Sequence, residues 1–308
     1  MFKKKALDKA CPYCGGVVRK RFSVGDINQK ISNTIFDYFG CSKCGLIYLD
    51  PIPKNIEEYY GQAYPAYQKI EDIKKQITDY DLQKIEILKK YSTGKNLLEI
   101  GPGNGTFSFL AKNADFNVDV IEMDINCCKF IEETVKIRKV INSNNVLESI
   151  SKIEDKYDVV VMWHVLEHLK EPWDVLKVIP RILAENGVLI LALPNSGSLQ
   201  LKLFKQFWKH IDAPRHVTFF PIKLLEQELS SMGLKKILGS TNDPVSSIFN
   251  CSAWWTHSLN NYIQESKRGF TRKLLQNPRV AHYAYKYLIK KAECIEGYGN
   301  AYTVIFKK

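Results

Sequence analysis

The feature that most constrains the fold is a glycine-rich run between an apolar segment and a helix-like segment. It reads Leu98-Glu-Ile-Gly-Pro-Gly-Asn-Gly-Thr-Phe107, between the β-prone residues 96–101 and the helical pattern of 106–113. Glycines let a backbone turn sharply and approach a ligand closely. The run therefore predicts a strand, a ligand-contacting loop and a helix in succession.

Strands and helices continue to alternate after this run. The pattern predicts strands at 118–124, 139–142, 157–162, 187–193, 234–241 and 301–306, and helices from Glu171-Pro172 onward and at 221–232. Such alternation is typical of an α/β fold with a largely parallel sheet. The spacing of apolar residues at 70–88 predicts one or two amphipathic helices that end at Gly94. We therefore expect three segments, 1–50, 51–94 and 95–308, with an aromatic and basic helical insertion at 243–299 in the last.

Four of the eight cysteines form two Cys-x-x-Cys pairs, each followed by glycine: Cys11 with Cys14, and Cys41 with Cys44. Each pair predicts a tight knuckle that aims two sulfurs at one point, and two knuckles complete a tetrahedral site that suits Zn²⁺. A redox pair is the alternative, but the symmetric repeat favours structural zinc. We therefore expect segment 1–50 to be a zinc ribbon.

The glycine-rich loop carries two departures from a dinucleotide site. A dinucleotide fingerprint requires glycine at position 106, where this chain has Thr106. Glu99 stands two residues before the first glycine, where its carboxylate would repel a pyrophosphate and attract a cation. These residues argue against a nicotinamide oxidoreductase and favour a positively charged ligand.

The run from Glu99 to Gly105 resembles motif I of the class I S-adenosylmethionine-dependent methyltransferases. The resemblance implies a Rossmann-like fold with a seven-stranded, mostly parallel sheet whose last strand is antiparallel. It also implies that Glu122, with Asp124 as the alternative, binds the ribose hydroxyls. The residues implied to bind the cofactor are Glu99, Gly101, Gly103, Gly105, Glu122, Met123, Asn145, Val146 and His164.

Three further segments, 157–169, 182–195 and 212–220, are similar to a bacterial subgroup of this family that commonly carries a Cys-x-x-Cys ribbon. The last of them contains Asp212-Ala-Pro-Arg-His216 in the loop after the fifth strand of the catalytic domain, at the sheet edge where ligands bind. We therefore expect His216 to be a general base and Arg215 to hold an acceptor phosphate or carboxylate. A structural turn with a satisfied histidine is the alternative reading of this segment.

The expected activity is methyl transfer to a small molecule, a sugar or a lipid-linked glycan, in surface polysaccharide or secondary metabolite synthesis. An RNA methyltransferase is the alternative, because the ribbon and the basic ends suit RNA. Against nucleic acid as a partner, Met162-Trp-His-Val165 lacks the Asn/Asp-Pro-Pro-aromatic and Pro-Cys motifs of nucleic-acid methylases. A non-catalytic module that keeps the fold is a third hypothesis, which the intact glycine motif opposes.

The composition of the chain also leads to expectations about its cellular location and about a basic surface. We recognise no signal peptide and no apolar run of membrane-spanning length, so the expectation is a cytoplasmic protein. The net charge is +11, and residues 261–308 hold 10 Lys and Arg against 3 Glu. Aromatic residues near this region could let it rest on an anionic membrane, and the cations expected there include Lys267, Arg268, Arg272 and Lys273. The sequence does not indicate an oligomeric state.

Overall fold

The computed structural model describes residues 9–60, 69–265 and 277–308, so the four basic residues named above lie outside the described part. The chain forms two compact units, each built from separate stretches of sequence. Unit 1 comprises residues 1–61, 194–225 and 249–301, and unit 2 comprises 62–193, 226–248 and 302–308. The expected boundaries at residues 50 and 94 remain a prediction about folding domains.

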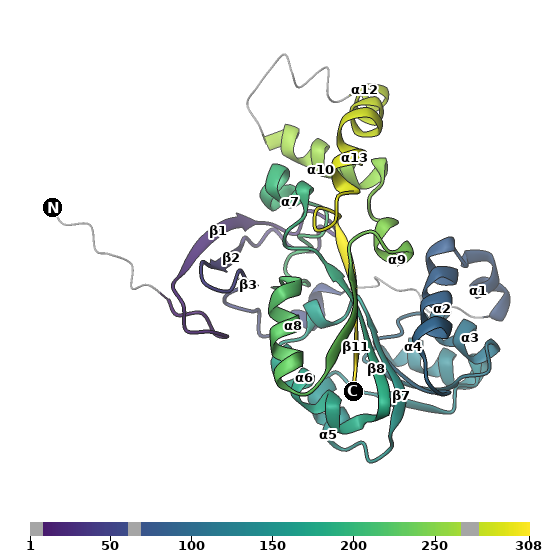
Figure 1. Cartoon of the computed structure of the whole chain (residues 1–308). Helices are drawn as coiled ribbons and strands as arrows, with labels where there is room; N and C mark the ends of the chain where they lie inside the picture. The colour runs from purple at the N-terminus through teal and green to yellow at the C-terminus, as the bar shows by residue number, and fades with distance from the viewer. Residues whose placement is uncertain (1–8, 61–68, 266–276) are drawn as a thin grey trace. The chain divides into compact units, whose positions relative to one another are not determined.

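Unit 2 is built on a seven-stranded sheet, which Figure 1 shows with β7, β8 and β11 running side by side. Its order is β10-β11-β8-β7-β4-β5-β6. The strands are β4 (Asn96–Ile100), β5 (Asn117–Glu122), β6 (Lys139–Asn142), β7 (Tyr157–Trp163), β8 (Leu183–Pro194), β10 (Lys235–Ser240) and β11 (Ala301–Lys307). Neighbours from β6 to β8 are parallel, whereas β11 pairs antiparallel with β10. The expected fold class is confirmed.

The central strands are apolar on both faces because helices cover both faces, as is usual for parallel sheets. Val159 and Val161 of β7 are fully buried in a cluster with side chains of α2 and α3. Figure 1 shows α2, α3 and α4 on one side of the sheet and α5 and α6 on the other. The α-helices that lie wholly in unit 2 are α1 (Ile70–Gln76), α2 (Asp79–Tyr91), α3 (Thr106–Asn113), α4 (Ile125–Phe130), α5 (Val146–Ser151), α6 (Pro172–Ile182) and α9 (Pro244–Ser247).

The order in which strands join the sheet of unit 2 reverses at β4. The chain goes from β4 to β5 and β6 on one side, and returns to β7 and β8 on the other. The carboxyl ends of β4, β5 and β7 therefore meet at a switch point, the place where open α/β sheets bind ligands. Two short helices belong to this unit: η2 (Ile131–Val135) follows helix α4, and η3 (Leu166–His168) follows strand β7.

Unit 1 contains a four-stranded antiparallel sheet of order β1-β2-β3-β9. Its strands are β1 (Val18–Val24), β2 (Phe36–Cys41), β3 (Ile47–Leu49) and β9 (Thr218–Phe219). Pairing of Ile47 with Phe219 joins residues 172 positions apart, which local sequence patterns do not reveal. The core of this sheet mixes N-terminal side chains such as Tyr38 with later ones such as Trp208.

The remaining helices of unit 1 are η1 (Ile56–Tyr59), α7 (Leu199–Phe204), η4 (Lys205–Phe207), α10 (Ser252–Glu265), α12 (Pro278–Ala284), η5 (Tyr285–Ile289) and α13 (Lys290–Glu293). Side chains of α7, α10 and η5 form a smaller apolar cluster of Phe204, Trp255, Leu259, Ile263 and Tyr285. Ile56 of η1 instead belongs to the core of the four-stranded sheet. Helix α8 (Ile222–Ser231) runs from unit 1 into unit 2. Among the described residues, we find no helix with the length and apolar character that a membrane span requires.

Candidate functional site

The glycine-rich loop follows β4 and leads into α3, as expected. Gly101 has a φ of 72° and Gly105 a φ of 77°, in the left-handed region that glycine tolerates best. A Cβ atom on Gly101 would lie 2.6 Å from a methyl carbon of Val165, and one on Gly105 would lie 2.7 Å from Ile131. Both the backbone angle and the close neighbours therefore require glycine at these two positions.

Glu99, the fourth residue of β4, is a buried carboxylate below this loop and is only 2% exposed. The hydroxyl of Ser108 on α3 donates a hydrogen bond to it. Burial raises the pKa of Glu99 to about 7, against the opposing effects of Ser108 and Lys84. A cationic ligand would stabilise the ionised form, so the environment of Glu99 suits a positive charge.

Glu122 ends β5 and faces the glycine-rich loop. Its Oε2 accepts a hydrogen bond of 2.9 Å from the N–H of Gly103, and its Oε1 accepts from the N–H groups of Met123 (2.7 Å) and Asp124 (2.9 Å). Burial raises the pKa of this carboxyl group. A carboxylate has about four acceptor positions, so three N–H donors leave capacity for a ligand hydroxyl.

The carboxylate of Asp124 caps a helix, whereas that of Glu122 faces the glycine-rich loop. Its Oδ1 accepts hydrogen bonds from the N–H groups of Asn126 (2.8 Å) and Cys127 (2.9 Å), which caps the start of α4. Between these two acids, Met123 is 42% exposed, as a residue that contacts a ligand can be. The geometry therefore favours Glu122 over Asp124 as the ribose-binding carboxylate, although the assignment stays a prediction.

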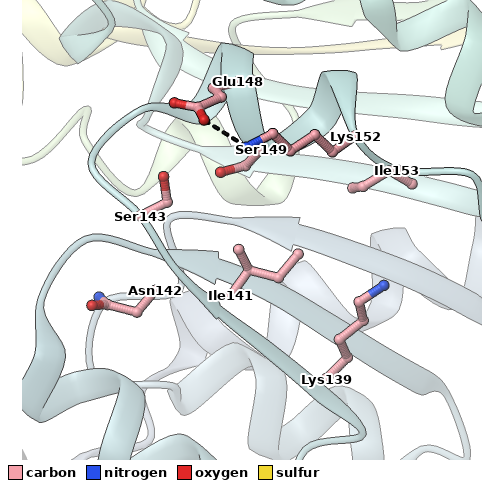
Figure 2. A pocket seen from close by; sticks show the side chains of 8 residues that line it. All are labelled: Lys139, Ile141, Asn142, Ser143, Glu148, Ser149, Lys152 and Ile153. Atoms are coloured by element: carbon pink, nitrogen blue, oxygen red, sulfur yellow. Dashed lines mark hydrogen bonds and ion pairs between the residues drawn. The ribbon is translucent and has the colours of Figure 1, made fainter.

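Asn145 and Val146, expected near the adenine, stand at the start of α5. The side chain of Asn145 caps this helix by accepting from the N–H of Glu148 at 3.0 Å, and Val146 is the first helical residue. A neighbouring open cavity of about 440 Å³ lies between β6 and α5 (Figure 2). Its lining residues are Lys139, Ile141, Asn142, Ser143, Glu148, Ser149, Lys152 and Ile153. None of the residues expected to bind the cofactor lines it.

His164 directly follows β7 at the switch-point edge of the sheet. Its φ of 56° lies in the left-handed region, and its N–H donates to the carbonyl of Ala192 at 2.9 Å. Its Nδ1 lies 3.3 Å from Oε1 of the fully buried Glu167. This contact holds the imidazole near the carboxyl end of β7, where the cofactor role expected of it remains a prediction.

The four cysteines of the two knuckles converge in unit 1. Their sulfurs all lie within 4.8 Å of one another, with 3.5 Å between Cys14 and Cys41 and 3.7 Å between Cys11 and Cys44. A tetrahedral ion with sulfur ligands at about 2.3 Å separates the sulfurs by roughly 3.8 Å. The knuckles are alike, because the N–H groups of Gly15 and Gly45 donate to the carbonyls of Cys11 and Cys41, each at 3.0 Å. These cysteines could therefore form a zinc site.

His216 lies in unit 1 and its ring orientation is fixed by a buried hydrogen bond. Its Nδ1 is 2.7 Å from the carbonyl oxygen of His210. Because a carbonyl only accepts, Nδ1 carries the proton, and Nε2 is the nitrogen that can act as a base. The side chain is 8% exposed. Its expected role as a base remains a prediction.

The side chain of Arg215 forms hydrogen bonds with other residues of unit 1. Its guanidinium forms two hydrogen bonds with Asp212 (2.8 and 2.7 Å), two with Asp26 (2.7 and 3.4 Å) and one with the carbonyl of Tyr59 (2.9 Å). It is 2% exposed. These contacts join the turn at 212–216 to the N-terminal segment, so they support a structural role, and acceptor binding by Arg215 remains an untested prediction.

Sequence reasoning did not single out Lys84 and Asp81, two buried charged residues of α2. The signal was present, because Asp81, Lys84 and Leu88 recur at the three- and four-residue spacing of one helix face. Charged residues on an otherwise apolar face are unusual. Lys84 is also one of the groups that lower the pKa of Glu99, and its Nζ lies 5.9 Å from the ring centre of Phe107, just after the glycine-rich loop.

Comparison with known proteins agrees with this geometry. A family model described as a methyltransferase domain matches residues 74–238. An uncharacterized protein from Methanocaldococcus jannaschii is 31% identical over 122 residues, which are 39% of this chain and 52% of that protein. The chain thus matches about half the length of this relative.

A solved structure described as a SAM-dependent methyltransferase from Archaeoglobus fulgidus has the same fold. It superposes with a TM-score of 0.50 at 18% sequence identity, covering 78% of this chain and 98% of that one.

Proposed function

The chain belongs to this methyltransferase-domain family, and from that premise we propose that it uses S-adenosylmethionine to methylate a small molecule, a sugar or a lipid-linked glycan. The observation that carries the proposal is the glycine-rich loop bordered by the buried carboxylates of Glu99 and Glu122. Two negative groups and no cation at the loop itself suit a cationic nucleoside and oppose a pyrophosphate.

In this proposal each border of the loop binds a different part of the cofactor. Gly101, Gly103 and Gly105 allow close approach of the ligand to the backbone. Glu122 accepts from the ribose hydroxyls, and Glu99 attracts the positively charged methionyl end. The bound cofactor would supply a methyl group on a sulfonium, and the neutral thioether that remains when the S–CH₃ bond breaks is a good leaving group. The protein then contributes mainly by positioning the acceptor in line with that methyl group.

The residues at the end of β7 bear on the class of acceptor. Met162-Trp-His-Val165 lacks both the Asn/Asp-Pro-Pro-aromatic and the Pro-Cys motifs of nucleic-acid methylases, which supports a small acceptor. A hydroxyl or an acidic C–H acceptor would benefit from a general base, and we assign that role to His216. Surface polysaccharide or secondary metabolite synthesis in the cytoplasm is the proposed setting. Structural zinc in the four-cysteine cluster completes the proposal.

Calorimetry tests the cofactor assignment directly. We expect the full chain to bind S-adenosylmethionine and S-adenosylhomocysteine, and to show no measurable binding of NADH. The Glu122→Ala variant should bind about 10-fold or more weakly, because a charge-assisted hydrogen bond contributes roughly 1.5–3 kcal/mol. Glu133→Ala removes an exposed acid and serves as the matched control with unchanged affinity. Binding of NADH, or no binding of either S-adenosyl compound, would refute the proposal.

A further inference from the structure

Lys84 is a buried cation in α2, paired with an acid one helical turn earlier. It is 8% exposed, and its Nζ lies 3.3 Å from Oδ1 of Asp81. Asp81 is itself fixed, because its Oδ2 accepts from the N–H (3.1 Å) and the hydroxyl (2.8 Å) of Thr78 at the start of the helix. Lysine is rarely buried unless it is paired, so the pair calls for an explanation.

Aromatic rings from three elements surround the ammonium group of Lys84. Its Nζ lies 4.2 Å from the ring centre of Tyr80 in α2, 5.9 Å from that of Phe107 in α3 and 5.8 Å from that of Trp163 in β7. Phe107 follows the glycine-rich loop, and Trp163 precedes His164 at the end of β7. Ring faces stabilise a cation at these distances, so the surroundings favour the protonated form of Lys84 although burial lowers its pKa.

Helix α3 links Lys84 to Glu99, because the Phe107 ring lies 5.9 Å from Nζ of Lys84 and the hydroxyl of the next residue, Ser108, donates a hydrogen bond to Glu99. Asp81 and Glu122 each raise the pKa of Glu99, as burial does, whereas Lys84 and the hydroxyl of Ser108 lower it. Lys84 is the cation among these groups. A carboxylate that is buried beside two other acids loses its charge readily unless a cation compensates, and Glu99 needs its charge to attract a cationic ligand.

We propose that Lys84, held in place by Asp81 and the aromatic rings, is a positioning residue that keeps Glu99 ionised for binding the cationic end of the cofactor. The inference rests on the proposed function and deepens it. Lys84 acts through Glu99, so its effect is on cofactor affinity and on the pH at which affinity is lost.

The sign of the effect follows from the charges. Glu99 binds a cation when ionised, so affinity is full above the pKa of Glu99 and falls as pH drops through about 7. In Lys84→Met the compensating charge is gone, the pKa of Glu99 rises, and the loss of affinity begins at a higher pH. For a shift of about one pKa unit, the variant binds about 10-fold more weakly than wild type at pH 6 and less than twofold more weakly at pH 8.5.

The experiment measures S-adenosylhomocysteine binding by calorimetry from pH 6 to 8.5. Titration of the ligand itself cancels in the ratio of variant to wild type. Lys84→Met should show the pH-dependent loss above, and Lys84→Arg should restore the wild-type profile. In a Glu99→Gln background, Lys84→Met should leave the pH dependence of S-adenosylhomocysteine affinity unchanged. A loss of affinity that is equal at every pH would indicate packing alone and overturn the inference.

Lys84→Gln gives an independent check if Lys84→Met does not fold. Glutamine can still donate a hydrogen bond to Asp81 but carries no charge. The midpoint should therefore move to higher pH, as in Lys84→Met. A shift to lower pH, or none, would overturn the inference. If wild type binds no S-adenosylhomocysteine, the proposed function itself fails, which is a distinct result.

Discussion

At the scale of single residues, the fold defines most clearly which ring nitrogen of His216 donates a hydrogen bond. The bond from Nδ1 to the carbonyl of His210 leaves Nε2 as the basic nitrogen. His216→Asn keeps an N–H donor for that carbonyl and removes the base. We expect turnover to fall by about 10²–10⁴-fold while S-adenosylhomocysteine affinity stays within about twofold of wild type.

Turnover is measured with a radiolabelled methyl donor and a sugar nucleotide, chosen from a panel, on which the wild-type protein is active. His282→Ala removes an exposed histidine and is the matched control. If His216→Asn retained wild-type turnover, the general base would lie elsewhere, and the hydrogen bond from His216 would be purely structural.

The residues that the sequence identified are those whose type is required by backbone geometry or charge. Gly101 and Gly105 could be predicted because only glycine fits their angles and neighbours. Local sequence could not show which acid caps α4 and which faces the loop, because Glu122 and Asp124 are two positions apart in the chain. It also could not show that Arg215 would be held by Asp26, which is 189 positions away.

At the scale of elements, the strands of unit 2, helix α3 and the start of α6 were predicted to within a few residues, whereas helices α4 and α5 were not predicted. Helix α3 and strand β6 have the expected bounds, because glycine and asparagine mark their ends. Strand β8 starts at Leu183, four residues before the expected start, because the polar residues Glu185 and Asn186 obscured its beginning. The two-residue strand β9 was not predicted, since its strand partner β3 comes from a distant part of the chain.

The two cysteine knuckles support a prediction about the metal. We expect about one zinc ion per chain by elemental analysis. Cys14→Ser should lower the zinc content and the melting temperature of the full chain, because metal-binding energy becomes folding energy in small sites of this kind. Cys294→Ser changes an exposed cysteine outside the cluster and should change neither. Equal zinc content in both variants would place the metal elsewhere.

At the scale of the whole molecule, the N-terminal segment shares its core with residues far along the chain. Phe22, Phe36, Tyr38, Ile47 and Leu49 pack with Leu201, Trp208, Ile211, Val217 and Phe219 in one cluster of unit 1. Strand β3 supplies the pairing partner of β9, and Tyr38 donates a 2.8 Å hydrogen bond to the carbonyl of His216. The cysteine-containing segment is therefore part of unit 1 and shares its core.

A chain without residues 1–50 tests this arrangement. Each large apolar side chain that is removed forfeits roughly 1.5–3 kcal/mol of burial, and several together equal the 5–15 kcal/mol of net stability typical of a domain. We therefore expect residues 51–308 to aggregate on size-exclusion chromatography, with Trp208 exposed to fluorescence quenching. The full-length variant Ile35→Ser, which changes a 64% exposed side chain, should remain monodisperse. A soluble, cooperatively folding 51–308 would instead show that the boundary at residue 50 separates independent domains.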